Sequence, residues 1–190
     1  IQVGARNMQN YDLLKELGKV YGFDVLVVDK VTALLPGHEE EREISSTLIK
    51  DEILKGHMEN AAMMLGRPYS IAGRIVHGRH VGTSLGFPTA NLPIPEGIVI
   101  PPNGVYATKT DIEDEGCFES MTNIGIRPTL NDGENASIET NIFDFEKNIY
   151  GKQARVDFYR FIRPEIRFAS LDELSSQLET DRRLIKKGGI

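Results

Sequence analysis

The spacing of apolar residues changes at residue 69, and this change constrains the fold more than any other feature of the chain. Before it, apolar residues recur at helical intervals. After it, short runs that suit strands alternate with turns rich in glycine, proline, asparagine and aspartate, such as residues 101–104 and 131–133. We predict strands over residues 69–77, 104–111, 117–124, 137–143 and 153–161. Several short strands at this spacing favour a mostly β, antiparallel barrel or sandwich.

A helix is predicted to close the chain. Ser170-Leu171-Asp172-Glu173 is a capping-box pattern, and leucines and an isoleucine follow at helical spacing up to Ile185. The basic residues near its end, 182–187, are interpreted as partners of the helix dipole rather than as a binding patch.

Residues 1–66 read as an α/β fragment. We predict a helix over residues 11–21, a buried parallel strand over 23–28, and helices over 44–55 and 58–65. Arg67-Pro68 is a natural boundary, because the residue before proline resists the helical conformation. The expected domains are therefore 1–66 and 67–190.

Composition narrows the class of partner. The 190 residues carry a formal net charge of −6, so we expect no nucleic-acid partner. The single cysteine suits a reducing cytoplasm, and no apolar run is long enough for a membrane span. The chain starts at Ile1 without a methionine, so we expect a fragment or a processed product. The sequence leaves the oligomeric state open.

Residues 86–91 combine a permissive glycine, a rigid proline and two oxygen-bearing side chains. Thr89 and Asn91 offer a hydroxyl and an amide oxygen, which are hard ligands that Mg²⁺ accepts beside substrate phosphates. The alternative is a turn whose Thr and Asn bond their own backbone. Upstream, glycines at 78, 82 and 86 are spaced so that backbone N–H groups could cradle phosphates.

Two further features of the sequence each allow two interpretations. Glu139 lies within a predicted strand, either on its solvent face or as a functional base in the mouth of a barrel. The hydroxyls of residues 45–47 begin a helix, which either holds an anion or is simply capped by them.

Several of these motifs together, in order along the chain, closely resemble the riboflavin kinase family. They are residues 73–78, 85–92, 104–107, 123–129, 138–144 and 150–152. Residues 1–66 resemble the end of the flavin-adenylating module that precedes this kinase in bacterial bifunctional riboflavin kinase/FAD synthetases. The stretch 44–50 is similar to a motif that usually ends in arginine, where this chain has Lys50.

The resemblance implies a six-stranded antiparallel Greek-key barrel that transfers the ATP γ-phosphoryl group to the riboflavin 5′-hydroxyl, giving FMN. By the same resemblance Thr89 and Asn91 hold Mg²⁺ and the nucleotide phosphates, and Glu139 is the catalytic base. The loop carrying Gly78, Gly82, Gly86 and Pro88 would close over ATP. Arg163, Arg167 and the last helix would border the flavin.

Two departures limit what the resemblance implies. Thr83 stands where bacterial relatives usually have a basic residue, and residues 3–7 only loosely match the adenylating module. We therefore expect kinase activity in this chain, with FAD formation confined to the longer parent protein. The alternatives are a non-catalytic barrel that binds flavin or nucleotide, and an oligonucleotide-binding barrel, which net acidity and the lack of tryptophan disfavour.

Overall fold

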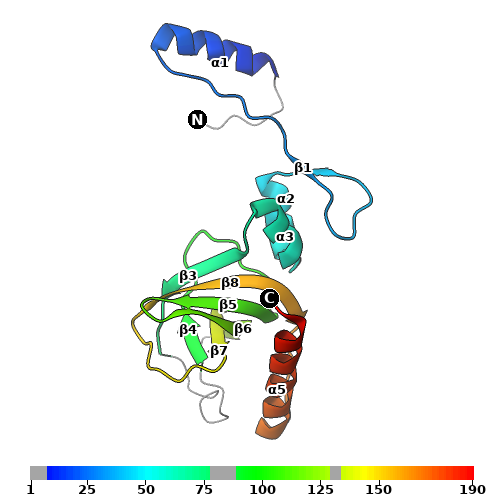
Figure 1. The fold of residues 1–190 in the computed structure, drawn as a ribbon, viewed down its shortest axis with the longest axis vertical. Helices are drawn as coiled ribbons and strands as arrows, with labels where there is room; N and C mark the ends of the chain where they lie inside the picture. The colour runs from blue at the N-terminus through cyan, green and yellow to red at the C-terminus, as the bar shows by residue number, and fades with distance from the viewer. Residues whose placement is uncertain (1–7, 78–88, 129–133) are drawn as a thin grey trace.

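The computed structural model describes residues 8–77, 89–128 and 134–190, and its largest element is a six-stranded antiparallel sheet (Figure 1). The sheet order is β3-β8-β5-β6-β7-β4. The strands are β3 (Tyr69–Arg74), β4 (Thr89–Leu92), β5 (Gly104–Ile112), β6 (Gly116–Pro128), β7 (Glu134–Ile142) and β8 (Gln153–Arg163). β5, β6 and β7 are neighbours in sequence and space, and β8 returns beside β5, which is a Greek key. The predicted Greek-key architecture is thus confirmed.

The sheet curls until its two edge strands meet. The only contact of this kind among the described residues is a single bridge between Val76, just after β3, and Asn91 of β4. The Val76 N–H donates to the Asn91 carbonyl oxygen at 2.9 Å. This bridge pairs two strand edges that would otherwise be open.

The inside of the curled sheet is apolar around a line of hydroxyl groups. Tyr106, Ile124, Ile138 and Phe158 are fully buried there. Beside them lies a chain of hydrogen-bonded hydroxyls, all buried: Thr110, Ser120, Thr108, Thr122 and Thr140, with consecutive oxygens 2.8–2.9 Å apart. These bonds satisfy polar groups that would otherwise be costly in the core.

The closing helix α5 (Leu171–Gly188) packs on the outer face of the sheet (Figure 1). Ser170 caps it by accepting a hydrogen bond from the Glu173 N–H at 3.2 Å, as the capping pattern predicts. Ile185 is fully buried in a cluster with Val105 and Met121 of the sheet. Basic residues of the last turns are used within the fold, since Arg182 and Lys186 both pair with Asp144.

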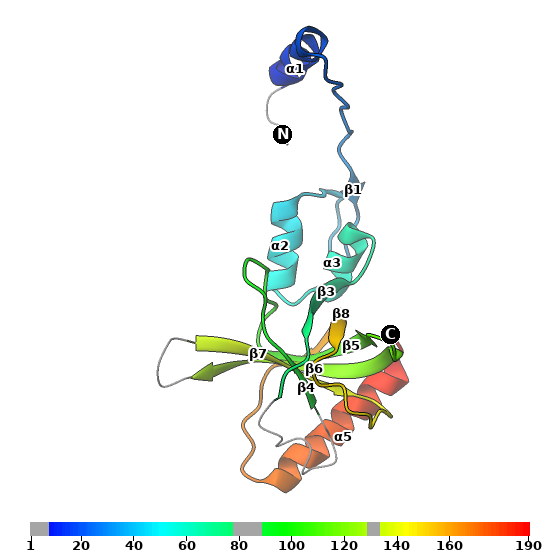
Figure 2. The ribbon, with the colours of Figure 1, turned by 90° about the vertical axis from the view of Figure 1, so that its left-hand side faces the viewer.

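Helices α2 (Ser46–Leu54) and α3 (Met58–Leu65) form a pair that packs against one side of the barrel (Figure 2). Ile53, Met58 and Ala61 belong to the same buried apolar cluster as Ile71 of β3. At the turn between the helices, the buried Glu52 carboxylate accepts hydrogen bonds from Lys55, His57 and Asn60. The predicted helices are confirmed, with Gly56 and Gly66 at positive φ after each one.

The predicted strand over residues 23–28 is wrong. Helix α1 (Met8–Tyr21) is present, but the residues after it form no strand and are widely exposed, with Leu26 88% and Val28 77% accessible. A parallel strand needs hydrogen-bonded neighbours, and no described strand lies beside this segment. Within the part of the chain that the structure describes, the next strand pairing after this segment is a short antiparallel one between β1 (Thr32–Ala33) and β2 (Arg42–Glu43). Among the described helices, none is both long and apolar enough to cross a membrane.

Candidate active site

A row of polar residues crosses three neighbouring strands. Asn91 of β4 is paired with Glu139 of β7, and Glu139 is paired in turn with Asn123 of β6. Residues directly opposite one another in a ladder present their side chains on the same face. Two residues along, Thr89 is paired with Asn141, which adds a second pair to that face.

This polar row lies on the outer face of the curled sheet. The alternating neighbours Ala90, Ile138 and Ile124 are buried in the barrel core, so Asn91, Glu139 and Asn123 face the other way. Asn91 and Asn141 are nevertheless almost fully buried, while Glu139 and Thr89 are partly accessible. The row is therefore a polar, half-sheltered surface rather than an open one.

The structure thus brings together three of the predicted site residues. Thr89, Asn91 and Glu139 come from segments about 50 positions apart and meet because β4 pairs with β7. Gly78, Gly82, Gly86 and Pro88 lie outside the described residues. The Glu139 side chain points away from the barrel interior, so its expected place inside a barrel mouth is wrong, while its role as a base stays a prediction.

The predicted flavin-bordering arginines lie at the end of β8. Arg163 makes a two-pronged ion pair with the buried Asp181 of α5, with Nη2–Oδ2 at 2.7 Å and Nε–Oδ2 at 2.9 Å. Its guanidinium also lies 5.9 Å from the Phe168 ring centre. Arg167 is exposed. Arg163 therefore fixes α5 beside the polar row.

Asn123 and Asn141 are candidate site residues that the sequence reasoning missed. Alternation along a strand indicates which face an amide occupies, but it does not indicate which residue lies opposite it on the next strand. The Asn123 side-chain nitrogen lies 3.4 Å from the Glu165 carboxylate. Gly125 leaves room for that carboxylate, because a Cβ there would lie 2.5 Å from Glu165 Oε1.

A small hollow opens beside Thr89, and we call it the Thr89 hollow. Its volume is about 80 Å³, and it lies between β4, the end of β7 and the connection from β7 to β8. The residues that line it are Thr89, Ala90, Ile142, Phe145, Glu146, Lys147, Asn148, Ile149 and Tyr150. The Tyr150 ring stacks on His77 with ring centres 3.8 Å apart. The lining of the hollow is mixed, with apolar side chains such as Phe145 and Ile149 beside the charged Glu146 and Lys147.

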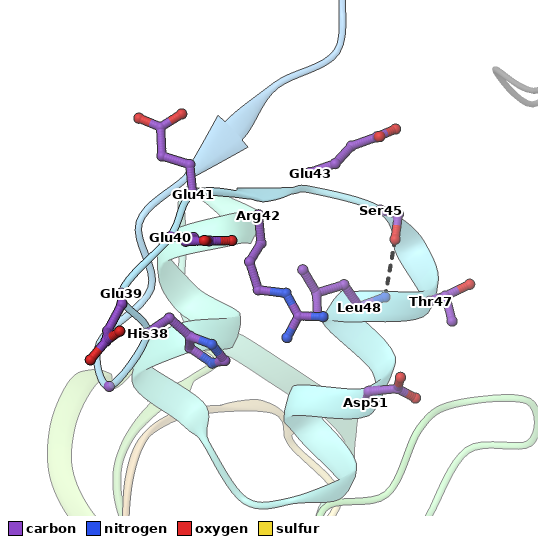
Figure 3. Close-up of a pocket in the computed structure, with 11 residues that line it drawn as sticks. His38, Glu39, Glu40, Glu41, Arg42, Glu43, Ser45, Thr47, Leu48 and Asp51 are labelled. Carbon is purple, nitrogen blue, oxygen red and sulfur yellow. Dashed lines mark hydrogen bonds between the residues drawn. The ribbon is translucent and has the colours of Figure 1, made fainter.

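A larger hollow, of about 730 Å³, lies at the start of α2 (Figure 3). Four glutamates between residues 39 and 43 and Asp51 line it, against one arginine, Arg42. Ser45 Oγ accepts a hydrogen bond from the Leu48 N–H at 3.2 Å, so it caps its own helix. This acidic lining disfavours an anion, and of the two readings the plain cap is the one the geometry shows.

The riboflavin kinase family (Flavokinase) matches residues 65–188, which include the whole six-stranded sheet and all of α5. The chain belongs to this family. Curated relatives extend the likeness into the N-terminal part. The bifunctional riboflavin kinase/FMN adenylyltransferase of Haemophilus influenzae is 38% identical over 178 residues, covering 94% of this chain and 55% of that protein.

A second relative of the same name, from Listeria monocytogenes, is 41% identical over 159 residues, covering 84% of this chain and 48% of its own length. The chain therefore spans about half the length of the curated relatives it matches. Among solved structures, a Streptococcus pneumoniae protein named as a macrolide-efflux protein superposes with a TM-score of 0.77 at 34% identity. It covers 90% of this chain and 54% of that one, and the transport role in its name belongs to that protein.

Proposed function

We propose that this riboflavin kinase domain transfers the γ-phosphoryl group of ATP to the 5′-hydroxyl of riboflavin, giving FMN. The observation that carries the proposal is the pairing of Asn91 with Glu139, with Thr89 two residues along the same face. Phosphoryl transfer depends on positioning and charge neutralisation, with a carboxylate near the attacking hydroxyl. These three side chains supply the polar groups that such a reaction needs.

Glu139 is the proposed base. A primary hydroxyl is a weak acid, so it attacks well only when a nearby acceptor takes its proton as the new bond forms. Glu139 is partly accessible at the centre of the polar row, between Asn91 and Asn123, so a hydroxyl of the flavin side chain can reach it.

The residues present fit a magnesium ion that arrives with ATP. Mg²⁺ commonly binds one or two protein oxygens together with substrate phosphates, and Thr89 and Asn91 offer such oxygens on one face of β4. When bound, the ion would neutralise charge on the phosphates. Thr89 and Asn91 would then hold the phosphates at a fixed distance from Glu139, because all three side chains stand on one rigid ladder.

The Thr89 hollow is the proposed entry point of the nucleotide. At about 80 Å³ it is smaller than a complete ligand pocket of roughly 300–1,000 Å³, so it can hold only one portion of ATP. Apolar side chains of its lining, such as Phe145 and Ile149, suit the base or ribose, and Thr89 belongs both to this lining and to the face of the polar row, toward which the phosphates would lie. The flavin would then approach from the Asn123 and Arg163 side, bordered by Phe168 and by Arg167.

We further propose that the longer parent protein adenylates FMN to FAD, while this chain forms FMN alone. The matched part of this chain covers about half the length of the relatives named for both activities. The lone Cys117 supports a reducing cytoplasm as the place of reaction.

Product analysis tests the proposal directly. The chain is incubated with riboflavin, ATP and Mg²⁺, and flavins are separated by chromatography. FMN without FAD is the expected result. Absence of FMN would overturn the kinase assignment in favour of a barrel that only binds its ligands, and FAD as product would overturn the claim about this chain's N-terminal part.

A further inference from the structure

The wall of the Thr89 hollow is built from a segment without helix or strand. Most of the lining comes from residues 145–150, within the connection between β7 and β8 (residues 143–152). Such a segment keeps its shape only through side-chain and backbone ties to its surroundings. The ties therefore decide the shape of the hollow.

One carboxylate, that of Glu115, holds this connection at two points. Glu115 lies in the turn between β5 and β6, and its side chain is only 12% exposed. Its Oε2 lies 2.6 Å from Lys147 Nζ, and its Oε1 lies 2.7 Å from Lys152 Nζ. Each carboxylate oxygen thus pairs with one lysine: Lys147 lies within the lining of the hollow, and Lys152 lies just after its last lining residue, Tyr150.

The remaining contacts hold the start of the connection and its second half, where Ile149 is buried in the barrel core. Near the start, the Phe145 ring meets Phe118 of β6 edge-to-face at 4.8 Å between centres. At the far end, Gly151 and Lys152 exchange backbone hydrogen bonds with Ile75 at 2.9 Å. Loss of the Glu115 contacts would leave these parts in place and release Lys147, which lines the hollow between them.

Glu115 is ionised whenever the enzyme works. Hydrogen bonds from Lys147 first and from Lys152 second lower the pKa of its carboxyl to about 2. The charge that holds the lysines is therefore constant across the neutral range. Ion pairs made by accessible lysines such as these are individually weak, so they can shape a loop without determining whether the barrel folds.

We propose that Glu115 is a positioning residue for the nucleotide: by holding Lys147 and Lys152 it sets the wall against which ATP binds. This inference rests on the proposed function, in which ATP enters the Thr89 hollow. Glu115 itself touches neither phosphate nor flavin. Its effect reaches ATP through the lysine that lines the hollow.

The matched pair for testing this is Glu115→Gln against Asp114→Asn. Both changes remove one negative charge from the same turn. Asp114 has a positive φ of 61°, a conformation that asparagine also adopts readily, so Asp114→Asn keeps the turn. Steady-state rates of FMN formation are measured with ATP varied at saturating riboflavin, and then with riboflavin varied.

For Glu115→Gln we expect the KM for ATP to rise about two- to ten-fold, the range that one or two exposed ion pairs support. The kcat and the KM for riboflavin should stay within two-fold of the wild type, and Asp114→Asn should match the wild type throughout. In a Lys147→Gln background, Glu115→Gln should raise the KM for ATP by a smaller factor than it does in the wild type. If Glu115→Gln fails to fold, the single Lys147→Gln variant tests the same contact through the KM for ATP. Lys147 is 71% exposed, so its replacement should not disturb folding.

Failure of this inference is distinguishable from failure of the proposed function. A wild-type chain that forms no FMN would sink the kinase assignment. If the wild-type chain forms FMN but the KM for ATP of Glu115→Gln is unchanged or lower, only the proposed role of Glu115 is refuted. An equal rise in Asp114→Asn would refute that role too, because it would assign the effect to general charge.

Discussion

Asn91 and Glu139 face each other across the β4–β7 ladder, with Asn91 almost fully buried and Glu139 partly accessible. This places a proposed phosphate-binding amide and a proposed base on adjacent strands, about 5 Å apart at their Cβ atoms by ladder geometry. A rigid ladder holds such a pair without rearrangement during the reaction. The predictions below begin from it.

Glu139→Gln should lower the kcat for FMN formation by about 10²-fold or more, because the amide cannot accept the hydroxyl proton. Ligand binding should remain, since shape and hydrogen-bonding capacity are nearly kept. Steady-state kinetics and calorimetric titration with riboflavin separate the two. The control is Glu119→Gln, because Glu119 lies on β6 on the same face of the sheet as Asn123. An unchanged kcat for Glu139→Gln would remove Glu139 from the mechanism.

Thr89→Val should raise the Mg²⁺ concentration needed for half-maximal rate by at least about ten-fold, the lower range for losing a group that supports a bound metal. Thr89→Ser keeps the hydroxyl and should behave like the wild type. The measurement is the rate of FMN formation against Mg²⁺ at fixed ATP. Equal Mg²⁺ curves for the Val and Ser variants would contradict a metal role for Thr89.

Arg163 and Asp181 form a buried ion pair between β8 and α5, and removing one partner should be costly. Asp181→Asn or Arg163→Met should each lower the free energy of unfolding by about 3–5 kcal/mol, because the other charge is left buried without its partner. The double variant Arg163→Met/Asp181→Leu should recover much of that loss. Urea unfolding followed by circular dichroism measures all three, and additive losses in the double variant would refute the pairing.

The buried hydroxyl chain should contribute to stability through its middle member. The Thr108 hydroxyl is hydrogen-bonded to those of Ser120 and Thr122, so Thr108→Val removes one partner from each of them. The change should lower the free energy of unfolding by about 1–3 kcal/mol. Thr110 stands at one end with one such bond, and Thr110→Val should cost less. Thermal unfolding ranks the two, and the reverse order would show that burial rather than the hydroxyl chain decides the cost.

The turn between α2 and α3 should lose stability in acid through Glu52. Burial alone raises the pKa of this carboxyl, but hydrogen bonds from Asn60, His57 and Lys55 outweigh it and lower the pKa to about 2, from an ordinary value near 4.5. A depressed pKa stabilises the fold fully above the ordinary value and progressively less as pH falls toward 2.

The comparison that isolates this contribution is wild type against Glu52→Gln. Their difference in free energy of unfolding should be constant above about pH 4.5 and shrink as the pH falls toward 2. Urea unfolding at several pH values measures it. A difference that is the same at pH 3 and pH 6 would mean that the Glu52 charge does not stabilise this turn.

The strands flanked by clear turn signals were predictable from sequence. β5, β6 and β8 begin within a residue of the predicted positions, because proline, glycine and asparagine mark their ends. β4 was not predicted as a strand, since Thr89-Ala90-Asn91-Leu92 is short and follows a proline and a glycine. It becomes one because the edge of β7 offers it hydrogen-bonding partners. Residues 23–28 show the converse, a strand-like sequence without a described neighbour.

The candidate site was predictable in its residue types but not in its geometry. Thr89, Asn91 and Glu139 could be singled out, yet nothing local indicates that Asn91 stands opposite Glu139 rather than Thr140. Register depends on the connections before and after each strand, and a shift of one residue would turn every side chain to the other face. The same reason hid Asn123, whose importance comes only from its place opposite Glu139.

The bridge between Val76 and Asn91 has a consequence for how ligand occupancy and local motion are linked. The strand that carries the proposed phosphate ligands has only four residues and is secured on one side by a full ladder and on the other by one bridge. Opening this seam would expose the Val76 amide to solvent exchange and would also release Thr89 and Asn91. A ligand that engages those two residues must therefore slow hydrogen exchange at Val76, so the closure of the barrel reports on whether its nucleotide is bound.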